Sequence, residues 1–436
     1  MIPGPIRRFW PLIAMVAAFC LAGCKPPEAA TENETQAPTP EPSPTPLYVP
    51  YKRLDTGKLF NGVELETSFS TDSGTNATAE VQDPSSYTLH LDLHVRIPRP
   101  VTTVDGLAAL NPALPALFPK LADWTTTAQV SPLFERLYRR KIQSLQQNLL
   151  RLDQLQSRHD FYDCETILEI QPAGAQRKLL WVQSDMDVDS DGSDSDRVPG
   201  VDASSQTFQP LTSYKWPKRG PNPNPFVDEH EARLVELQSS LDRATTAAQR
   251  EQIKEAIDAV RVETRMLKAD SFLVAATDPY IVVPFSIIAQ RDDPFSPSVG
   301  DFCAVIYQDR IYPAIIGDVG PAGKVGEASL RIAQELNPRA TSENRPVSAL
   351  KITYLIFPGT AERPFAPPDL AHWHDRVDAL LKEAGGYSGT LFSWKDLTVP
   401  PPTLTPSPTP VPTPSATGTA GTSPSPSASA APSVPP

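Results

Sequence analysis

Proline is concentrated toward the two ends of this chain, and its distribution confines the foldable part to the middle. Of the 50 prolines, eight lie in residues 25–50 and 13 in residues 400–436. Such segments favour the extended polyproline II conformation and bury too little apolar surface to fold. About 350 residues remain between them, enough for one large domain or two ordinary ones.

The composition narrows the class of protein further. Hydrophobic residues make up 40% of the chain, with 16 Phe, 11 Tyr and 6 Trp, which excludes a wholly disordered protein. The net charge is −12, so the phosphates of a nucleic acid would be repelled, whereas a cationic partner would be attracted. We expect no nucleic-acid partner, and we also expect a monomer.

The first residues have the pattern of an export signal. Arg7 and Arg8 precede an apolar stretch of about 13 residues, which is too short to span a bilayer as a mature helix. The stretch ends in Leu21-Ala22-Gly23-Cys24, which resembles a bacterial lipobox. An ordinary secretory signal with a chance Cys is the alternative, but the order of these residues favours lipidation of Cys24. We therefore expect an exported protein, anchored by lipid to the cell membrane or outer membrane and facing the periplasm or exterior.

These segments give a division of the chain into five parts. They are a lipoprotein signal peptide (1–23), a Pro-rich linker (24–47), an N-terminal β/α region of unknown role (48–158), a main domain (159–398) and a disordered Pro/Ser/Thr-rich tail (399–436). Apart from Cys20 in the signal and Cys24, only Cys164 and Cys303 remain. They either form one disulfide or are two buried thiols, and their spacing does not suggest a metal site.

Periodicity predicts the elements of the two folded parts. Residues 89–97 alternate strictly between apolar and polar, as in a strand with one buried face, and residues 131–158 have helical spacing that begins at Ser131-Pro132. Residues 228–268 are helical with a break near residues 243–246, which predicts an inserted helical hairpin.

The rest of the main domain is rich in short strands. A strand hairpin is expected over residues 302–316, a helix from near Gly326 to Leu336, and a last helix over residues 369–383. Short strands outnumber helices, so we predict an α+β fold with a β-rich, mixed, barrel-like core, flanking helices and the inserted hairpin.

Seven Asp residues lie between positions 185 and 202, and with Arg197 they give this segment a charge of −6. The alternation of Asp187, Asp189 and Asp191 before a Gly is typical of a Ca²⁺ loop, but position 12 of that loop would be Val198 where a bidentate Glu belongs. Crowded carboxylates favour cations. The alternatives are therefore Ca²⁺ at the Asp187–Asp191 loop, a positively charged substrate, or a merely solvated acidic loop.

A second candidate site lies in residues 317–329. We expect a strand to end at Asp318 and a helix to begin beside Glu327, with a Gly/Pro loop between the two carboxylates. Hydrolysis of a glycosidic bond needs one carboxyl group to protonate the leaving oxygen and another to assist the attacking water. A helix N-terminus would favour the charged form of Glu327, so a general acid there would need burial or Asp318 to raise its pKa. Lys324 adds a cation between the two acids.

Five separated blocks together resemble the fungal-type endo-chitosanases of glycoside hydrolase family 75. The blocks are residues 187–192 (Asp-Val-Asp-Ser-Asp-Gly), 279–284 (Pro-Tyr-Ile-Val-Val-Pro), 300–307 (Gly-Asp-Phe-Cys-Ala-Val-Ile-Tyr), 317–318 (Gly-Asp) and 326–329 (Gly-Glu-Ala-Ser). The resemblance covers roughly residues 160–360 apart from the hairpin. It implies an inverting endo-hydrolase of β-1,4-linked glucosamine, with Asp318 as general base and Glu327 as general acid.

The substrate implied by the resemblance agrees with the charge of the chain. Chitosan is a polycation, and an acidic cleft would attract its ammonium groups. The residues predicted to contact the substrate are Asp185, Asp187, Asp189, Asp191, Tyr280 and Tyr307, and Tyr214 and Trp216 are further candidates for stacking on sugar rings. No cofactor is expected beyond the Ca²⁺ alternative at the Asp187–Asp191 loop.

The leading hypothesis is thus an exported, chitosanase-like glycoside hydrolase acting on chitosan or a related amino-sugar polymer. The alternative from another class is a non-catalytic glycan- or cell-wall-binding lipoprotein. A third is a lytic enzyme that acts on peptidoglycan.

Overall fold

The computed structural model describes most of the chain between the two proline-rich ends. The described residues are 63–67, 73–83, 85–86, 91–95, 97–151, 164–174, 177–290, 292–344 and 346–398. The predicted signal peptide, Cys24, the linker and the tail lie outside them. Among the described residues, no helix combines the length and the apolar character needed to cross a membrane.

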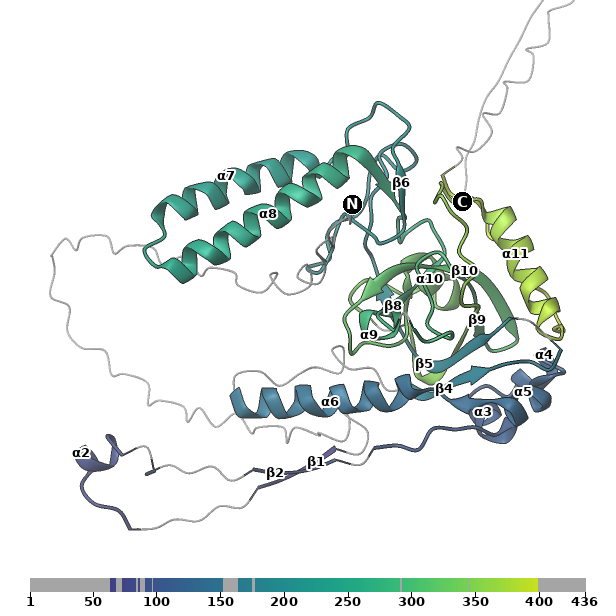
Figure 1. Ribbon diagram of the computed structural model, residues 1–436, viewed down its shortest axis with the longest axis horizontal. Helices are drawn as coiled ribbons and strands as arrows, with labels where there is room; N and C mark the ends of the chain where they lie inside the picture. Colours follow the sequence, from purple (N-terminus) through teal and green to yellow (C-terminus); the bar gives the residue numbers. More distant parts are fainter. Residues whose placement is uncertain are drawn as a thin grey trace, which may run out of the picture. The chain divides into compact units, whose positions relative to one another are not determined.

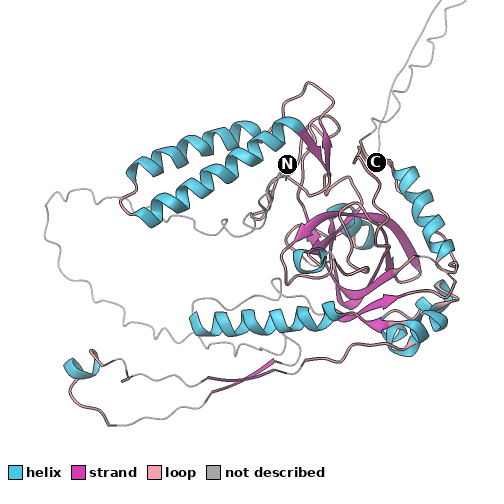
Figure 2. Ribbon diagram, in the orientation of Figure 1, coloured by secondary structure: helices cyan, strands magenta, loops and turns pink. Residues whose placement is uncertain are grey.

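A closed six-stranded barrel forms the centre of the fold (Figure 1; strands are magenta in Figure 2). Its strands are β5 (Leu179–Asp189), β8 (Tyr280–Pro284), β9 (Phe302–Tyr307), β10 (Arg310–Gly320), β11 (Glu327–Ser329) and β12 (Val347–Ile356). They follow one another in the order β11-β8-β10-β9-β12-β5, and the pairing of β5 with β11 closes the ring. The β8–β10 and β5–β11 pairs are parallel and the others antiparallel, which confirms the predicted mixed barrel. On the other side of β5, β4 (Cys164–Ile170) and β3 (Gln129–Val130) extend the sheet.

Helices cover both faces of this sheet. Side chains alternate between the faces, so the neighbours Trp181 and Val182 of β5 belong to two different apolar clusters. The Trp181 cluster includes residues of α3 (Val104–Leu110), α4 (Leu114–Leu117), α5 (Leu121–Thr127) and α11 (Leu370–Glu383). The Val182 cluster includes residues of α6 (Pro132–Arg151), α9 (Phe285–Ile288) and α10 (Leu330–Leu336). Because both faces are covered, β5 is buried along its whole length.

The predicted helical hairpin is confirmed. It consists of α7 (Val227–Arg243) and α8 (Ala247–Ala269), which pack along each other and are flanked by the antiparallel pair β6 (Lys215–Pro217) and β7 (Asp270–Phe272). The break falls where it was predicted, because the Thr246 side chain and Gln249 form a capping box at the start of α8.

Two further predictions concern the N-terminal region. The predicted strand of residues 89–97 contains β2 (Leu91–Val95), which pairs with β1 (Val63–Thr67), and α2 (Ala77–Glu80) lies between them in the chain. The helix predicted from Ser131 is α6, and the Ser131 hydroxyl accepts a hydrogen bond from the Leu133 amide at its start. Cys164 and Cys303 are both buried thiols, the second of the two alternatives.

Candidate active site

Asp318 lies on β10, at a bulge against β8. Ile316 stands opposite Ile281 and Asp318 opposite Val282, so Gly317 is the extra residue. A Cβ atom at Gly317 would lie 2.5 Å from Cγ of the Tyr280 ring, which explains the glycine at this position. Bulges of this kind change the direction in which a side chain points.

Hydrogen bonds and burial act in opposite directions on the Asp318 carboxylate. Its Oδ1 accepts hydrogen bonds from the Ser213 amide (2.9 Å), the Ser213 hydroxyl and the Val319 amide (2.7 Å). Burial raises its pKa to about 6, although these three donors favour the charged form and lower it. Ser213 is 105 residues away in the chain, and no sequence pattern points to its role.

Glu327 lies on a strand, and the prediction that it opens a helix is wrong. It belongs to β11, where it pairs with Asp187 of β5 on one side and Val282 of β8 on the other, and α10 begins only at Leu330. Gly326 allows this close approach, because its φ is +81° and a Cβ atom there would lie 2.1 Å from the Asp185 carbonyl oxygen.

The electrostatic conflict expected at a helix N-terminus therefore does not arise. Burial raises the pKa of Glu327 to about 7; Lys324 opposes this rise, and the charge of Asp189 adds to it. Such a carboxyl group can retain a proton near neutral pH, as a general acid requires.

The barrel places Asp318 and Glu327 on either side of one strand. Both stand opposite Val282 of β8, so the two residues are in matching register on the strands that flank it. Neighbouring strands are about 4.8 Å apart, so the two Cα atoms are about 10 Å apart. Residues in matching register point to the same face of a sheet.

Lys324 forms ion pairs with two carboxylates of the site. Its Nζ donates to Oε1 of Glu327 (2.7 Å) and lies 2.8 Å from Oδ2 of Asp187. The Lys324 side chain is only 17% exposed, so these contacts are largely shielded from water. The cation that the sequence placed between the two predicted catalytic acids thus contacts Glu327 directly.

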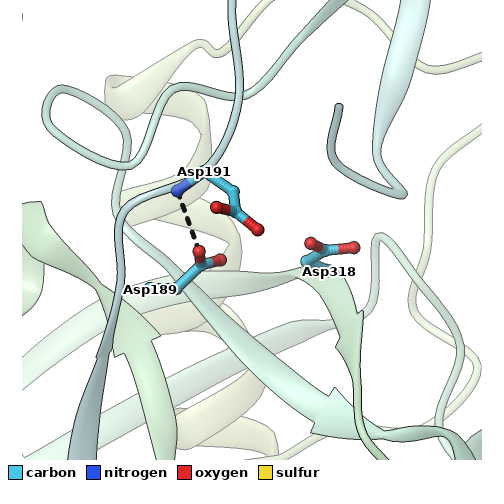
Figure 3. A group of neighbouring side chains, drawn as sticks. All are labelled: Asp189, Asp191 and Asp318. Atoms are coloured by element: carbon cyan, nitrogen blue, oxygen red, sulfur yellow. Dashed lines mark hydrogen bonds between the residues drawn. The ribbon is translucent and has the colours of Figure 1, made fainter. Parts of the chain in front are cut away.

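Three other carboxylate oxygens, one each from Asp189, Asp191 and Asp318, lie within 4.8 Å of one another (Figure 3). Asp189 accepts hydrogen bonds from the Tyr280 hydroxyl and the Asp191 amide, each at 2.9 Å. Asp191 accepts one from the Gln209 amide at 2.8 Å. The three side chains come from three segments: the end of β5, the loop after it, and β10.

Burial is the main cause of the high proton affinity of this cluster. It raises the pKa of Asp189 to about 7, with the charge of Asp318 adding to the rise. Burial together with the charge of Asp189 raises the pKa of Asp191 to about 10. At neutral pH the cluster therefore favours either a retained proton or a cation. Because Asp187 pairs with Lys324, a Ca²⁺ site built on the Asp187–Asp191 loop stays a prediction.

The second half of the Asp-rich run, which includes Asp194 and Asp196, forms ion pairs that stabilise the fold. The Asp194 carboxylate contacts Nε of Arg197 (2.6 Å), whose guanidinium also binds Asp278 through two hydrogen bonds. Asp196 accepts from the ammonium of Lys218 at 2.8 Å, and hydrogen bonds including this one lower its pKa. The charges of Asp194 and Asp196 are therefore neutralised by Arg197 and Lys218.

The remaining predicted contact residues are placed less favourably for a substrate. Asp185 is 1% exposed, and its Oδ1 accepts from the Leu350 amide (2.7 Å). Tyr280 is fully buried, so its ring cannot stack on a sugar, although its hydroxyl supports Asp189. Tyr307 pairs with Arg310 at the opposite end of β10 from Asp318.

Tyr214 and Trp216, the other two aromatic candidates, are also buried. Tyr214 is stacked on Phe365, and Trp216 lies beneath the guanidinium of Arg197. Tyr214, Trp216 and Tyr280 therefore belong to the apolar core around the site.

A pair of carboxyl groups, of which one has a pKa raised by burial, is typical of glycosidases. Comparison with known families agrees: residues 186–384 match the family described as fungal chitosanase of glycosyl hydrolase group 75. The match contains both Asp318 and Glu327 and extends through α11, beyond the predicted end near residue 360. These residues therefore form a chitosanase-like glycoside hydrolase domain, which confirms the predicted family. None of the curated proteins compared with the chain matches it.

Proposed function

We propose that residues 159–398 form an inverting endo-hydrolase of β-1,4-linked glucosamine polymers such as chitosan. The observation that carries this proposal is that Asp318 and Glu327 are both in register with Val282, one strand apart on each side. Inverting glycosidases hold their two carboxyl groups about 6.5–9.5 Å apart, which leaves room for a water molecule. Two carboxylates on strands separated by a third are compatible with that spacing.

In this mechanism Asp318 is the general base and Glu327 the general acid. Asp318 takes a proton from a water molecule, whose oxygen bonds to the anomeric carbon on the face opposite the leaving group. Glu327 gives its proton to the glycosidic oxygen as the bond between that oxygen and the anomeric carbon breaks. The pKa values support these roles, because that of Asp318 is raised to about 6 and that of Glu327 to about 7. Between these values, the state with Asp318 ionised and Glu327 protonated is the most populated.

The cluster of Asp189 and Asp191 beside Asp318 supports an amino-sugar substrate. Burial disfavours the ionised forms of these two carboxyl groups, and an adjacent ammonium group of glucosamine would stabilise those forms. Asp187, already paired with Lys324, lies on the same strand face two residues before Asp189. We propose Asp187, Asp189 and Asp191 as the side chains that select the ammonium groups, without a metal cofactor.

Export and anchoring are part of the same proposal. Cys24 would carry the lipid, and the proline-rich segment after it would hold the hydrolase, acting as a monomer, away from the membrane. A Cys24→Ser variant should move the protein from the membrane fraction to the soluble exported fraction. Retention of this variant in the membrane fraction would contradict lipidation at Cys24.

The substrate proposal is tested by incubating the purified enzyme with chitosan, fully acetylated chitin and peptidoglycan sacculi. We expect the viscosity of chitosan to fall before many reducing ends appear, as internal cleavage requires, with little change in the other two polymers. Preferential release from sacculi would show a lytic enzyme. Binding to chitosan with no change in chain length would show a glycan-binding protein, and either result would overturn the proposal.

A further inference from the structure

The two oxygens of the Glu327 carboxyl group have different surroundings. Oε1 accepts the hydrogen bond from the ammonium of Lys324 at 2.7 Å, and the same ammonium is held by Asp187 at 2.8 Å. Oε2 faces Gly320 at the end of β10, since a Cβ atom on Gly320 would lie 3.2 Å from it. Gly320 is two residues after Asp318 on this strand, so Oε2 faces the strand that carries the general base.

The loop that carries Lys324 is fixed at several points. The Lys324 amide donates to the Pro321 carbonyl oxygen (3.1 Å), and the Ser286 hydroxyl donates to the Ala322 carbonyl oxygen (2.6 Å). At its end, the Gly326 carbonyl oxygen accepts from the Asp187 amide at 2.8 Å. The ammonium is thus presented to Glu327 by a braced loop.

An ammonium group has three donors and no acceptor. The carboxyl oxygen that accepts its hydrogen bond is therefore the one that keeps its lone pairs, and a proton on the carboxyl group belongs on the other oxygen. Accordingly we propose that Lys324 is a positioning residue that fixes the Glu327 carboxyl group and directs its catalytic proton to Oε2, and that Gly320 keeps this oxygen accessible to the substrate. This inference rests on the proposed role of Glu327 as general acid.

The charges around Glu327 make Lys324 the decisive cation among the described residues. The other titratable groups that act on Glu327 are Asp187, Asp189 and Asp191 from β5 and the loop after it, Asp318 from β10, and Tyr354 from β12. The four carboxyl groups raise the proton affinity of Glu327 when they are ionised, and Lys324 opposes them. Removal of the Lys324 charge should therefore raise the pKa of Glu327.

The first test compares Lys324→Met with Lys324→Arg. We expect kcat of Lys324→Met on chitosan to fall about 10- to 100-fold because the acid loses its fixed geometry. The basic limb of its pH profile should move to higher pH. Arg also donates to Oε1, so Lys324→Arg should keep the basic limb near its wild-type position and recover part of kcat. Lys218→Met, which removes a similarly buried ion pair with Asp196, is the matched control and should leave both quantities unchanged.

The second test crowds Oε2, because a Cβ atom on Gly320 would lie 3.2 Å from it and 2.9 Å from Cγ1 of the neighbouring Val282. Gly320→Ala should lower kcat about 10-fold with little change in KM, and without the upward movement of the basic limb. Its control is Gly200→Ala, where an added Cβ atom has no neighbour within 4 Å. Unchanged kcat in Gly320→Ala, or a kcat of Lys324→Met above the wild-type value, would overturn the inference. The latter would show that Lys324 blocks the acid.

A readout independent of turnover separates this inference from the proposed function. The protonated carboxyl band of Glu327 in infrared difference spectra can be assigned by its loss in Glu327→Gln. We expect this band to titrate at higher pH in Lys324→Met than in the wild type, even if chitosan is not the substrate. Titration at the same or a lower pH would overturn the electrostatic role of Lys324 whatever the substrate is.

Discussion

The two halves of the Asp-rich run show how similar sequence can serve opposite purposes. Asp189 and Asp191, in the first half, meet Asp318 across the barrel, and burial raises the pKa of all three. Asp194 and Asp196, in the second half, contact cationic side chains that neutralise them. Charge density alone therefore did not define the site. What distinguishes Asp189 and Asp191 from Asp194 and Asp196 is that the fold supplies a cationic partner only to the latter two carboxylates; Asp187, which also lies in the first half, is paired with Lys324.

The largest expected effect follows removal of either proposed catalytic carboxyl group. Asp318→Asn cannot accept the proton of the attacking water, and Glu327→Gln cannot donate one to the leaving oxygen, so each should lower kcat about 10²–10⁴-fold. Reducing-end release from chitosan measures the loss, and circular dichroism checks that the variants are folded. Wild-type rates in either folded variant would remove that residue from the mechanism.

A substitution in the second half of the run should lower the stability of the protein and leave its turnover almost unchanged. In Asp194→Asn the Arg197 guanidinium loses a buried ionised partner, so the free energy of unfolding should fall by about 3 kcal/mol. Chemical denaturation measures this change, and kcat of the folded variant should stay within about twofold of the wild type. A large loss of kcat with unchanged stability would place Asp194 in the site and remove the contrast between the halves.

A substitution in the first half of the run should have the opposite effect on stability: it should raise the free energy of unfolding, whereas Asp194→Asn lowers it. The pKa of Asp191 is near 3.8 in an unfolded chain and about 10 in the folded protein, so the folded state loses stability as pH rises between these values. Asp191→Asn has no such proton, and its amide oxygen can still accept from the Gln209 amide. At pH 8 we expect the variant to be more stable than the wild type by at least about 1 kcal/mol, a rise in Tm of about 2–4 °C.

The pH dependence is the control for this prediction. Near pH 4 the wild-type carboxyl group is protonated when folded and about half protonated when unfolded, so the difference in Tm between the two proteins should nearly vanish. A variant less stable than the wild type at pH 8 would show that the Asp191 carboxylate is stabilised by a cation.

The smallest expected effect is that of a chelator. Asp189 already accepts hydrogen bonds from Tyr280 and the Asp191 amide, and Asp187 is paired with Lys324, so we expect hydrolysis to be independent of divalent cations. Activity on chitosan with EDTA should equal that with added Ca²⁺. A loss that Ca²⁺ restores would support the calcium alternative and would assign the first half of the run to a metal.

Short-range sequence patterns were sufficient to predict the helix starts and the short strands. The Ser131-Pro132 start and the break near residues 243–246 both mark real helix ends. The short strands predicted a barrel, although its closure depends on the long-range pairing of β5 with β11. The order of the five sequence blocks predicted Asp318 and Glu327 as the catalytic pair, but it did not show that the two residues lie on either side of β8.

The errors have physical causes. Residues 327–329 (Glu-Ala-Ser) have little intrinsic preference for a strand, and their pairing with β5 and β8 overrides it. The support of Asp318 by Ser213 spans 105 residues without any pattern, and buried Tyr280 resembles an exposed stacking residue when only the sequence is considered.

The central claim is that Asp318 and Glu327 act from opposite sides of the glycosidic bond through an intervening water. Proton NMR of chitosan oligomers during the first minutes of hydrolysis measures the configuration of the new reducing ends before they equilibrate. The account predicts that the α-anomer appears first, as inversion of a β-linkage requires. Initial release of the β-anomer would contradict it, because that product requires a covalent intermediate on one of the two carboxylates.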